Sequence, residues 1–278
     1  MNFEFQQNND GSFAIYNNEI GDIYYSNIGA HNEAMQKFVI PADVTSLKSQ
    51  KIKILDICYG MGYNSKTFVD YCVKNNYNFE FEIDCVELDK NILSLGLLTF
   101  DKNIDFDIHI NFGQQILMQA DFLDNMQNIL QENNLKVFFK QLEKENSFKE
   151  DILSDSLVKK DKIIAFLHNI YYQNHEFFKK NTNFAKINLI LGDLLGVLPG
   201  LSSGYDFIFH DAFSIRKQPE LWSEKVFKDY YRLLNHNGKL LTYSNSRVVR
   251  RILENIGFNV KINYNENEKQ NGTIAIKT

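Results

Sequence analysis

The stretch Lys51–Phe68, KIKILDICYGMGYNSKTF, decides the fold of this chain. Its opening part, Lys51–Cys58, is rich in apolar and β-branched side chains, as in a buried strand. The turn Tyr59–Gly62 contains two glycines, and a helical pattern runs from Ser65 to Lys74. A strand, a glycine-containing turn and a helix in this order begin a βαβ unit, the repeat of a parallel sheet with helices on both faces.

The same alternation continues along the chain. The next predicted strand is Phe79–Val86, which ends at Glu87, and helical segments separate the strands that follow. Those later strands are predicted at Ile187–Leu191, Tyr205–Phe209 and Lys239–Tyr243. Repeated strand–helix alternation predicts an α/β fold with a doubly wound, Rossmann-like sheet.

The end of the chain refines this fold class. A helix is predicted at Arg247–Ile256, with Gly257 placed to end it. Two strands, Phe258–Tyr264 and Thr273–Lys277, then flank a polar turn, so the last strand should run antiparallel to the others. That ending is unusual for a nicotinamide-binding domain. It is usual in the class I S-adenosylmethionine-dependent methyltransferase version of the fold.

Two segments depart from the alternation. Residues 1–50 are predicted to form an N-terminal extension, with a hairpin from Ser12–Tyr16 and Asp22–Ser26 and a helix from Gly29 that stops before Pro41. Residues 51–278 would form the methyltransferase domain. Within it, helix formers dominate about 112–184, which predicts a helical insertion that caps the sheet edge. A lid or a substrate platform is the functional alternative.

Composition restricts the class of protein. The 278 residues are 44% apolar and 23% charged, which is ordinary globular usage. The sequence has no long apolar run and its start lacks a basic region, so we expect a cytoplasmic protein without a membrane span or signal peptide. Three cysteines without a C-x-x-C motif predict neither a disulfide framework nor a metal site.

The net charge of −5 means that nucleic-acid binding would need a local basic patch. The residues that could form it follow the predicted strands 205–209 and 239–243; they are Arg216, Lys217, Arg247 and Arg250. The alternative for these side chains is an ordinary solvated surface, which we prefer for Arg251.

Acidic residues and glycines lie where the first two strands end. Gly60 and Gly62, after Asp56, would let a ligand carboxylate approach the backbone, although a G-x-G after a strand can simply be a tight turn. Glu87 lies 25 residues beyond Gly62, a spacing suited to a carboxylate that accepts hydrogen bonds from ribose hydroxyls. Its alternative is a solvated carboxylate at a strand end.

Two more strand ends carry an aspartate. Asp193 could receive the exocyclic amine of adenine or cap the following helix, and both roles can coexist. Asp211 follows the strand 205–209, where ligands of open α/β sheets bind, and would face the transferred group. The adjacent His210 is interpreted as structural. Trp222 could stack on a base, but packing against the next helix is favoured.

Several motifs together resemble the methyltransferase half of the bacterial bifunctional proteins that make 5-methylaminomethyl-2-thiouridine in tRNA. The N-terminal match is Asp10–Ser12, then Tyr25–Ala30 with Glu33. Asp56–Asn64 resembles the acidic-x-G-F-G-T-G-x-N turn of that family, with Cys58 in place of its first glycine and Met61 in place of its threonine. The most distinctive match is the stretch from Asp211 to Trp222, which resembles D-x-F-x-P-x-K-N-P-E-L-W.

The resemblance implies S-adenosylmethionine as cofactor, with a set of binding residues that comprises Glu33, Asp56, Tyr59, Gly60, Gly62, Asn64, Glu87, Asp193 and Asp211. It also implies an N-methyltransferase that acts on 5-aminomethyl-(2-thio)uridine at the wobble position, with the tRNA anticodon region as partner. Asp211 would position the amine first and act as a base second. Because no flavin-binding segment follows Thr278, we expect the methylating activity alone, beside a separate FAD-dependent oxidase or aminomethyl-forming complex.

Two other functions stay open at this point. A polyamine aminopropyltransferase uses a similar sheet and a strand-end aspartate against an amine, but its turn is richer in glycine and the Pro-Glu-Leu-Trp block is not its hallmark. A non-catalytic S-adenosylmethionine-binding module would be consistent with Cys58 and Met61. Transfer of a methyl group, transfer of an aminopropyl group or binding without transfer separates the three.

Overall fold

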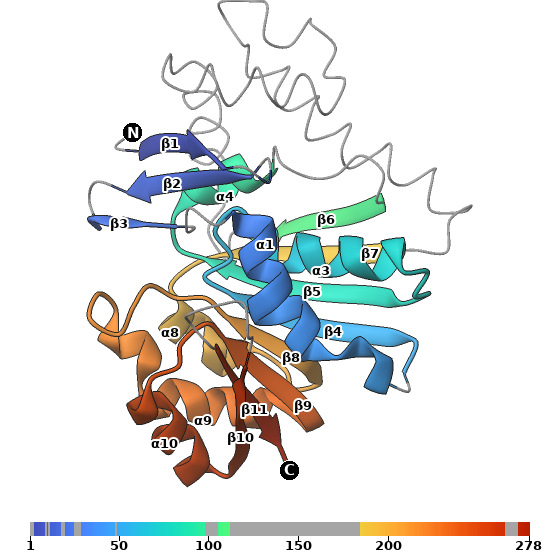
Figure 1. The fold of residues 1–278 in the computed structure, drawn as a ribbon, viewed down its shortest axis with the longest axis vertical. Coiled ribbons are helices and arrows are strands. Elements are labelled where there is room, and N and C mark those ends of the chain that lie inside the picture. Colours follow the sequence, from blue (N-terminus) through green and yellow to red (C-terminus); the bar gives the residue numbers. More distant parts are fainter. Residues whose placement is uncertain are drawn as a thin grey trace, which may run out of the picture.

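A computed structural model describes residues 3–8, 10, 12–17, 20–24, 29–47, 49–97, 105–111, 184–264 and 272–278. An eight-stranded mixed sheet lies at its centre (Figure 1), with the strand order β10-β11-β9-β8-β4-β5-β7-β6. Its strands are β4 (Lys51–Ile57), β5 (Glu80–Glu87), β6 (Asp105–Asn111), β7 (Phe184–Leu191), β8 (Tyr205–His210), β9 (Leu234–Thr242), β10 (Phe258–Asn263) and β11 (Gly272–Lys277).

The pairing of these strands confirms the predicted sheet. From β6 to β9 every neighbouring pair is parallel, whereas β11 is antiparallel to both β9 and β10. The strand order reverses at β4, which pairs with β5 on one side and β8 on the other. Ligands of open α/β sheets bind outside the carboxyl ends of the strands at such a reversal.

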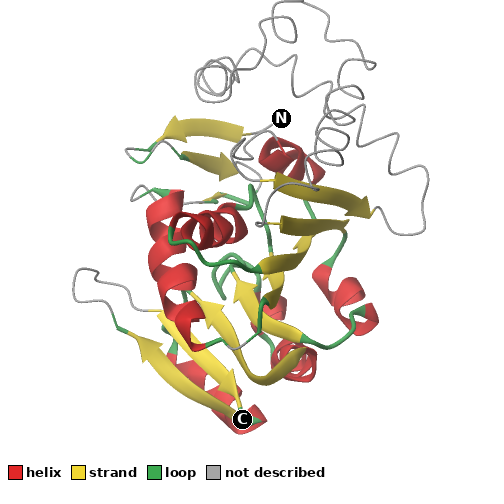
Figure 2. Cartoon of the chain, turned by 90° about the vertical axis from the view of Figure 1, so that its right-hand side faces the viewer, coloured by secondary structure: helices red, strands yellow, loops and turns green. Residues whose placement is uncertain are grey.

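Helices cover both faces of the sheet, as Figure 2 shows. They are α3 (Tyr63–Lys74), α4 (Lys90–Leu97), α8 (Leu194–Val197), α9 (Glu224–Leu233) and α10 (Arg247–Ile256), with short 3₁₀ turns at Val44–Ser46, Leu198–Gly200 and Pro219–Trp222. Because successive side chains of a strand point to opposite faces, Ile54 joins one buried cluster with Phe68 of α3, and Leu55 joins the other with Phe227 of α9. This explains why the strands read as continuous apolar runs.

The N-terminal section forms a separate three-stranded antiparallel sheet of β1 (Phe3–Gln7), β2 (Phe13–Asn17) and β3 (Asp22–Ile23). The predicted hairpin is confirmed as the β2–β3 pair. Strand β1 was not predicted, although the alternation of Phe3 and Phe5 with polar residues is a strand signal.

The prediction that the first helix stops before Pro41 is wrong. Helix α1 (Ala30–Ala34) continues through a π-helical turn, Met35–Val39, into α2 (Ile40–Ala42). A proline normally ends a helix because its ring meets the carbonyl four residues earlier, and the wider π turn just before Pro41 makes room for it. The helix ends at Asp43, whose φ of 51° is left-handed.

The strands differ from the prediction in two further places. Strand β6 was missed, although Phe106, Ile108 and Ile110 alternate with polar residues. Strand β9 begins at Leu234 rather than Lys239, because a register irregularity opposite Tyr205–Phe207 accommodates the turn-like residues that follow Leu234.

The predicted helical insertion lies outside the described residues, except that Phe184 already belongs to β7. Its structure therefore stays a prediction. Among the helices that the structure describes, none has the length and apolar content needed to cross a membrane.

Candidate functional site

A cavity of about 1150 Å³ opens at the carboxyl ends of the parallel strands. The segments after four strands line it: Cys58 after β4, Glu87–Asn91 after β5, Gly192–Leu195 after β7 and Asp211–Ser214 after β8. The N-terminal section contributes further lining residues, which are Asn17, Ile20, Asp22, Ile23, Tyr24 and Glu33. The site therefore combines the strand ends of the main sheet with the β2–β3 hairpin and α1.

The turn after β4 has an unusual backbone. Cys58, Gly60 and Gly62 have φ angles of 56°, 59° and 80°, in the left-handed region that favours glycine. A Cβ on Gly62 would lie 2.2 Å from the Tyr59 ring, so only glycine fits there. The left-handed φ of Cys58 also explains why the family turn that Asp56–Asn64 resembles has a glycine at the position of Cys58.

Asp56 supports this turn from beneath. It is fully buried, and the Ser65 hydroxyl donates a hydrogen bond to its Oδ2, which joins β4 to the start of α3. Burial raises the pKa of Asp56 to about 8. Five of the predicted cofactor residues are not among those that line the cavity, namely Asp56, Tyr59, Gly60, Gly62 and Asn64.

Glu87 holds the turn and lines the cavity at once. Its Oε2 accepts the Gly60 amide at 2.7 Å, and its Oε1 accepts the amides of Leu88 and Asp89, each at 2.9 Å. A carboxylate offers about four acceptor positions, so Oε2 keeps one for a ligand hydroxyl. Burial raises the pKa of Glu87 to about 7, while the three amide bonds oppose that rise.

Asp193 caps the following helix and also lies in the cavity lining, so the two roles left open for it are compatible. It lines the cavity, and its side chain accepts the Leu195 amide at 3.2 Å as the N-cap of α8. Capping uses one carboxylate oxygen, which leaves the other to accept a hydrogen bond from a ligand amine.

Asp211 lies beside a donor and a second acid. The Asn64 amide donates to Asp211 Oδ2 at 2.8 Å. Burial raises the pKa of Asp211 to about 7 and the charge of Glu33 raises it further, whereas the bond from Asn64 lowers it. A carboxyl group with a pKa near neutrality can accept a proton from a substrate and release it to water.

Aromatic residues of this cavity were not predicted as site residues. Tyr24 and Phe213 line it with ring centroids 5.0 Å apart, and Tyr243 lines it while its hydroxyl donates to the Ala212 carbonyl at 2.9 Å. Trp222 is buried and donates to the Phe213 carbonyl at 2.7 Å, as its packing interpretation expects. The position of Phe213 two residues after Asp211 was the available signal.

His210 is structural, as interpreted. It is fully buried, and its Nδ1 lies 2.9 Å from the Tyr230 hydroxyl. Burial lowers its pKa to about 3. It is not one of the residues that line the cavity.

The predicted basic residues lie in two places outside the cavity lining. Lys217 donates to the carbonyls of Ile20 and Gly21, at 2.9 and 3.3 Å, next to the exposed Arg216. Arg247 and Arg250 line a separate hollow of about 410 Å³ at the start of α10. Among the described residues, no group of three or more His, Cys, Asp or Glu side chains could hold a metal ion.

Comparison with known proteins shows which enzymes this chain resembles. Residues 159–278 match a family model described as S-adenosyl-L-methionine-dependent methyltransferase. An uncharacterized protein of Methanocaldococcus jannaschii is 26% identical over 268 residues, which are 96% of this chain and 58% of that protein. The tRNA 5-methylaminomethyl-2-thiouridine biosynthesis bifunctional protein MnmC of Campylobacter hominis is 29% identical over 162 residues, 58% of this chain and 24% of that protein.

A shorter sequence match and a structural match point to the same group of proteins. The MnmC protein of Cupriavidus necator is 36% identical over 74 residues, which are 27% of this chain and 11% of that protein. The crystal structure of MNMC2 from Aquifex aeolicus matches with a TM-score of 0.62 at 22% identity, over 98% of this chain and 70% of that one. This chain therefore spans less than two thirds of the curated relatives quoted above.

These findings confirm the predicted fold and cofactor. The sheet with its antiparallel last strand is the class I methyltransferase fold. The family match supports S-adenosylmethionine as the cofactor. The described residues fit that molecule, since the cavity presents the remaining acceptor position of Glu87 and the carboxylate of Asp193 at neighbouring strand ends.

Proposed function

We propose that this chain, an S-adenosylmethionine-dependent methyltransferase related to the methyltransferase part of MnmC proteins, methylates the amine of 5-aminomethyl-(2-thio)uridine at the wobble position of tRNA. The product would be 5-methylaminomethyl-(2-thio)uridine. The observation that carries the proposal is the Asp211 carboxyl group, which Asn64 holds in the same cavity as Glu87 and Asp193.

The donor half of the site would lie along β5 and β7. Glu87 would accept a hydrogen bond from a ribose hydroxyl through Oε2, and Asp193 would accept one from the adenine amine. Bound S-adenosylmethionine supplies a methyl group on a positively charged sulfur. The Gly60 amide joins the turn Cys58–Gly62 to Glu87, so the two parts of this half of the site hold each other in place.

The acceptor half would centre on Asp211. An alkyl amine holds its proton near neutral pH, since the amine of lysine has a pKa of ~10.4. Asp211 would orient the amine by a hydrogen bond and accept its proton, for which a pKa of about 7 is suited. With its proton on Asp211, the amine would direct its lone pair at the methyl group that the donor would supply, and the sulfur would keep the electron pair of the broken S–CH₃ bond.

The tRNA would approach through its anticodon region, with Arg216, Lys217, Arg247 and Arg250 as the side chains to test for phosphate contacts. Lys217 would have to exchange its carbonyl partners on the β2–β3 hairpin for a phosphate. A separate FAD-dependent oxidase or aminomethyl-forming complex would supply the acceptor. Both partners are part of the proposal.

The test uses the purified chain and tRNA from cells that lack it. Incubation with S-adenosylmethionine, followed by nucleoside analysis, should convert 5-aminomethyl-(2-thio)uridine into its N-methyl product. Decarboxylated S-adenosylmethionine in a parallel reaction tests aminopropyl transfer. Absence of the methylated nucleoside, with the donor shown to bind, would refute the proposed function and favour a non-catalytic module.

A further inference from the structure

Two hydrogen bonds hold the backbone of Phe213 in the acceptor half of the site. Its amide donates to Gln218 Oε1 at 3.2 Å, and its carbonyl accepts the Trp222 indole N–H at 2.7 Å. Trp222 itself packs edge-to-face on His210, with ring centroids 4.5 Å apart. The segment after β8 thus fixes the backbone of Phe213 from both sides, while its half-buried side chain lines the cavity.

The N-terminal section meets this segment across the cavity. The Tyr24 ring lies 5.0 Å from the Phe213 ring at an interplanar angle of 66°. Lys217 ties the same two segments together through the carbonyls of Ile20 and Gly21. Two independent contacts therefore hold an aromatic wall, Tyr24 with Phe213, in the cavity that Asp211 also lines.

A third aromatic side chain extends the wall. Tyr243 lines the cavity, and its hydroxyl is tied to the Ala212 carbonyl between Asp211 and Phe213. Its ring packs edge-to-face against Trp222 at 5.8 Å. Glu87 and Asp193, to which the proposed function assigns the donor, follow β5 and β7, whereas Phe213 and Tyr243 follow β8 and β9 and leave that side of the cavity for a second molecule.

We propose that Phe213, together with Tyr24, forms the subsite that binds the pyrimidine ring of the acceptor by stacking, an inference that rests on the proposed function. Aromatic side chains are a general means of binding unpaired bases, because every base has an apolar π face. A ring held next to Asp211 would bring its aminomethyl substituent to that carboxyl group. Because these side chains are already held in place, binding of the base costs less conformational entropy.

The test compares three variants of the full chain. Phe213→Leu keeps apolar volume but removes the ring, and Phe213→Tyr restores a ring. Tyr231→Leu is the matched control, because Tyr231 and Phe258 form a similar pair, 4.9 Å apart at 86°, and neither lines the cavity. The readouts are kcat/KM for the 5-aminomethyluridine nucleoside and for undermodified tRNA, and the Kd for S-adenosylmethionine.

The Phe213→Leu variant should lose roughly tenfold or more in kcat/KM for both acceptors, in line with the usual contribution of one stacked base. Its Kd for the donor should stay within about twofold of the wild type, and Phe213→Tyr should recover most of the loss. Equal effects of Phe213→Leu and Tyr231→Leu, with an active wild type, would overturn the subsite and leave the proposed function intact. A wild type that methylates neither acceptor would overturn both.

Discussion

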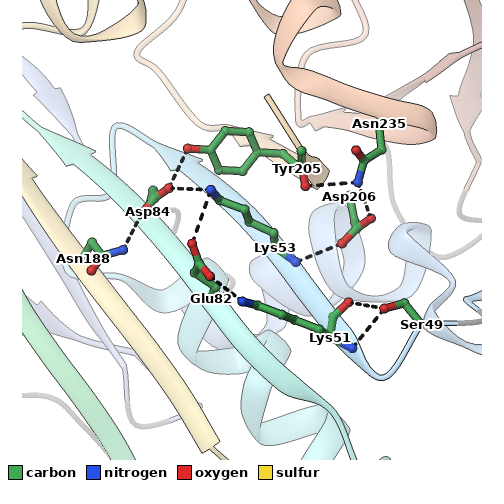
Figure 3. Close-up of polar contacts among 10 residues, drawn as sticks. Ser49, Lys51, Lys53, Glu82, Asp84, Asn188, Tyr205, Asp206 and Asn235 are labelled. Carbon is green, nitrogen blue, oxygen red and sulfur yellow. Dashed lines mark hydrogen bonds and ion pairs between the residues drawn. The ribbon is translucent and has the colours of Figure 1, made fainter. Parts of the chain in front are cut away.

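The two ends of the parallel strands use the same residue types in opposite ways. At the amino end, acidic side chains of β5 and β8 are paired with lysines and hydrogen-bond donors (Figure 3). At the carboxyl end, Asp56, Glu87 and Asp211 form no ion pair with any described Lys or Arg. The contrast separates charges that stabilise the sheet from the carboxyl groups of Glu87 and Asp211, which line the cavity and are available for chemistry.

The amino end is a closed network. Lys53 lies 3.3 Å from Glu82 and 3.6 Å from Asp84, and Lys51 lies 2.7 Å from Glu82. Asp84 also accepts the Tyr205 hydroxyl at 2.6 Å and the Asn188 amide at 2.5 Å, as Figure 3 shows. The hydrogen bond from Lys51 lowers the pKa of Glu82, the opposite of the shift at Glu87.

The largest expected effect is the loss of turnover on replacing Asp211 at the carboxyl end. Asp211→Ala should lower kcat by roughly 10²- to 10⁴-fold, the usual contribution of a proton-transfer group, and change donor affinity far less. Kinetics with undermodified tRNA and titration with S-adenosylmethionine measure the two quantities. An unchanged kcat would remove Asp211 from the mechanism.

Replacing Asp84 at the amino end should have the reverse outcome. Asp84→Ala leaves Tyr205, Asn188 and Lys53 without their common acceptor and should lower the free energy of unfolding by roughly 2–4 kcal/mol. Activity of the folded fraction should persist. Asp70→Ala is the control, since its pair with Lys74 is exposed and should be worth under about 1 kcal/mol. Urea unfolding measures both variants, and equal losses would contradict the contrast.

A smaller effect concerns the pH dependence of catalysis. The Glu33 charge raises the pKa of Asp211 and the Asn64 bond lowers it. In the proposed mechanism activity requires the ionised Asp211, so the acidic limb of kcat/KM should move to lower pH in Glu33→Gln and to higher pH in Asn64→Ala. Full pH profiles of both variants check this. Shifts in the same direction would show that Asp211 does not govern the limb.

The smallest effect is expected at the basic residues outside the cavity. If Arg247 and Arg250 each contact a phosphate, each replacement by Ala should reduce the slope of log K against log salt for tRNA by about 1. Arg251→Ala is the control, because its side chain was assigned to the solvated surface of α10. Binding titrations at several salt concentrations measure the slopes; identical slopes for all three variants would exclude this contact.

The carboxyl-end half of this contrast could be predicted from the sequence, because strand periodicity and strand-end acids are local signals, whereas the ion pairs of the amino end were not predicted. The pattern at Lys51–Cys58 predicted the parallel sheet, and the pattern at Phe258–Lys277 predicted its antiparallel end. Because Glu87, Asp193 and Asp211 each follow a predicted parallel strand, they were expected at one edge of that sheet. The continuation of the first helix past Pro41 was not predictable, since it depends on a π turn.

What the sequence did not reveal depends on tertiary contacts. Asp56 and Asn64 share a motif with the glycines, yet they act through Ser65 and Asp211 rather than from the cavity lining. Tyr24 meets Phe213 only after the N-terminal section folds against the sheet. No spacing rule relates residues that lie so far apart along the chain.

A structure determined with bound S-adenosylmethionine tests the central claim most directly. We expect the ribose at Glu87 Oε2, the adenine amine at Asp193 and the methyl carbon directed toward Asp211. A donor bound away from these three carboxylates, or none bound at saturating concentration, would contradict the account.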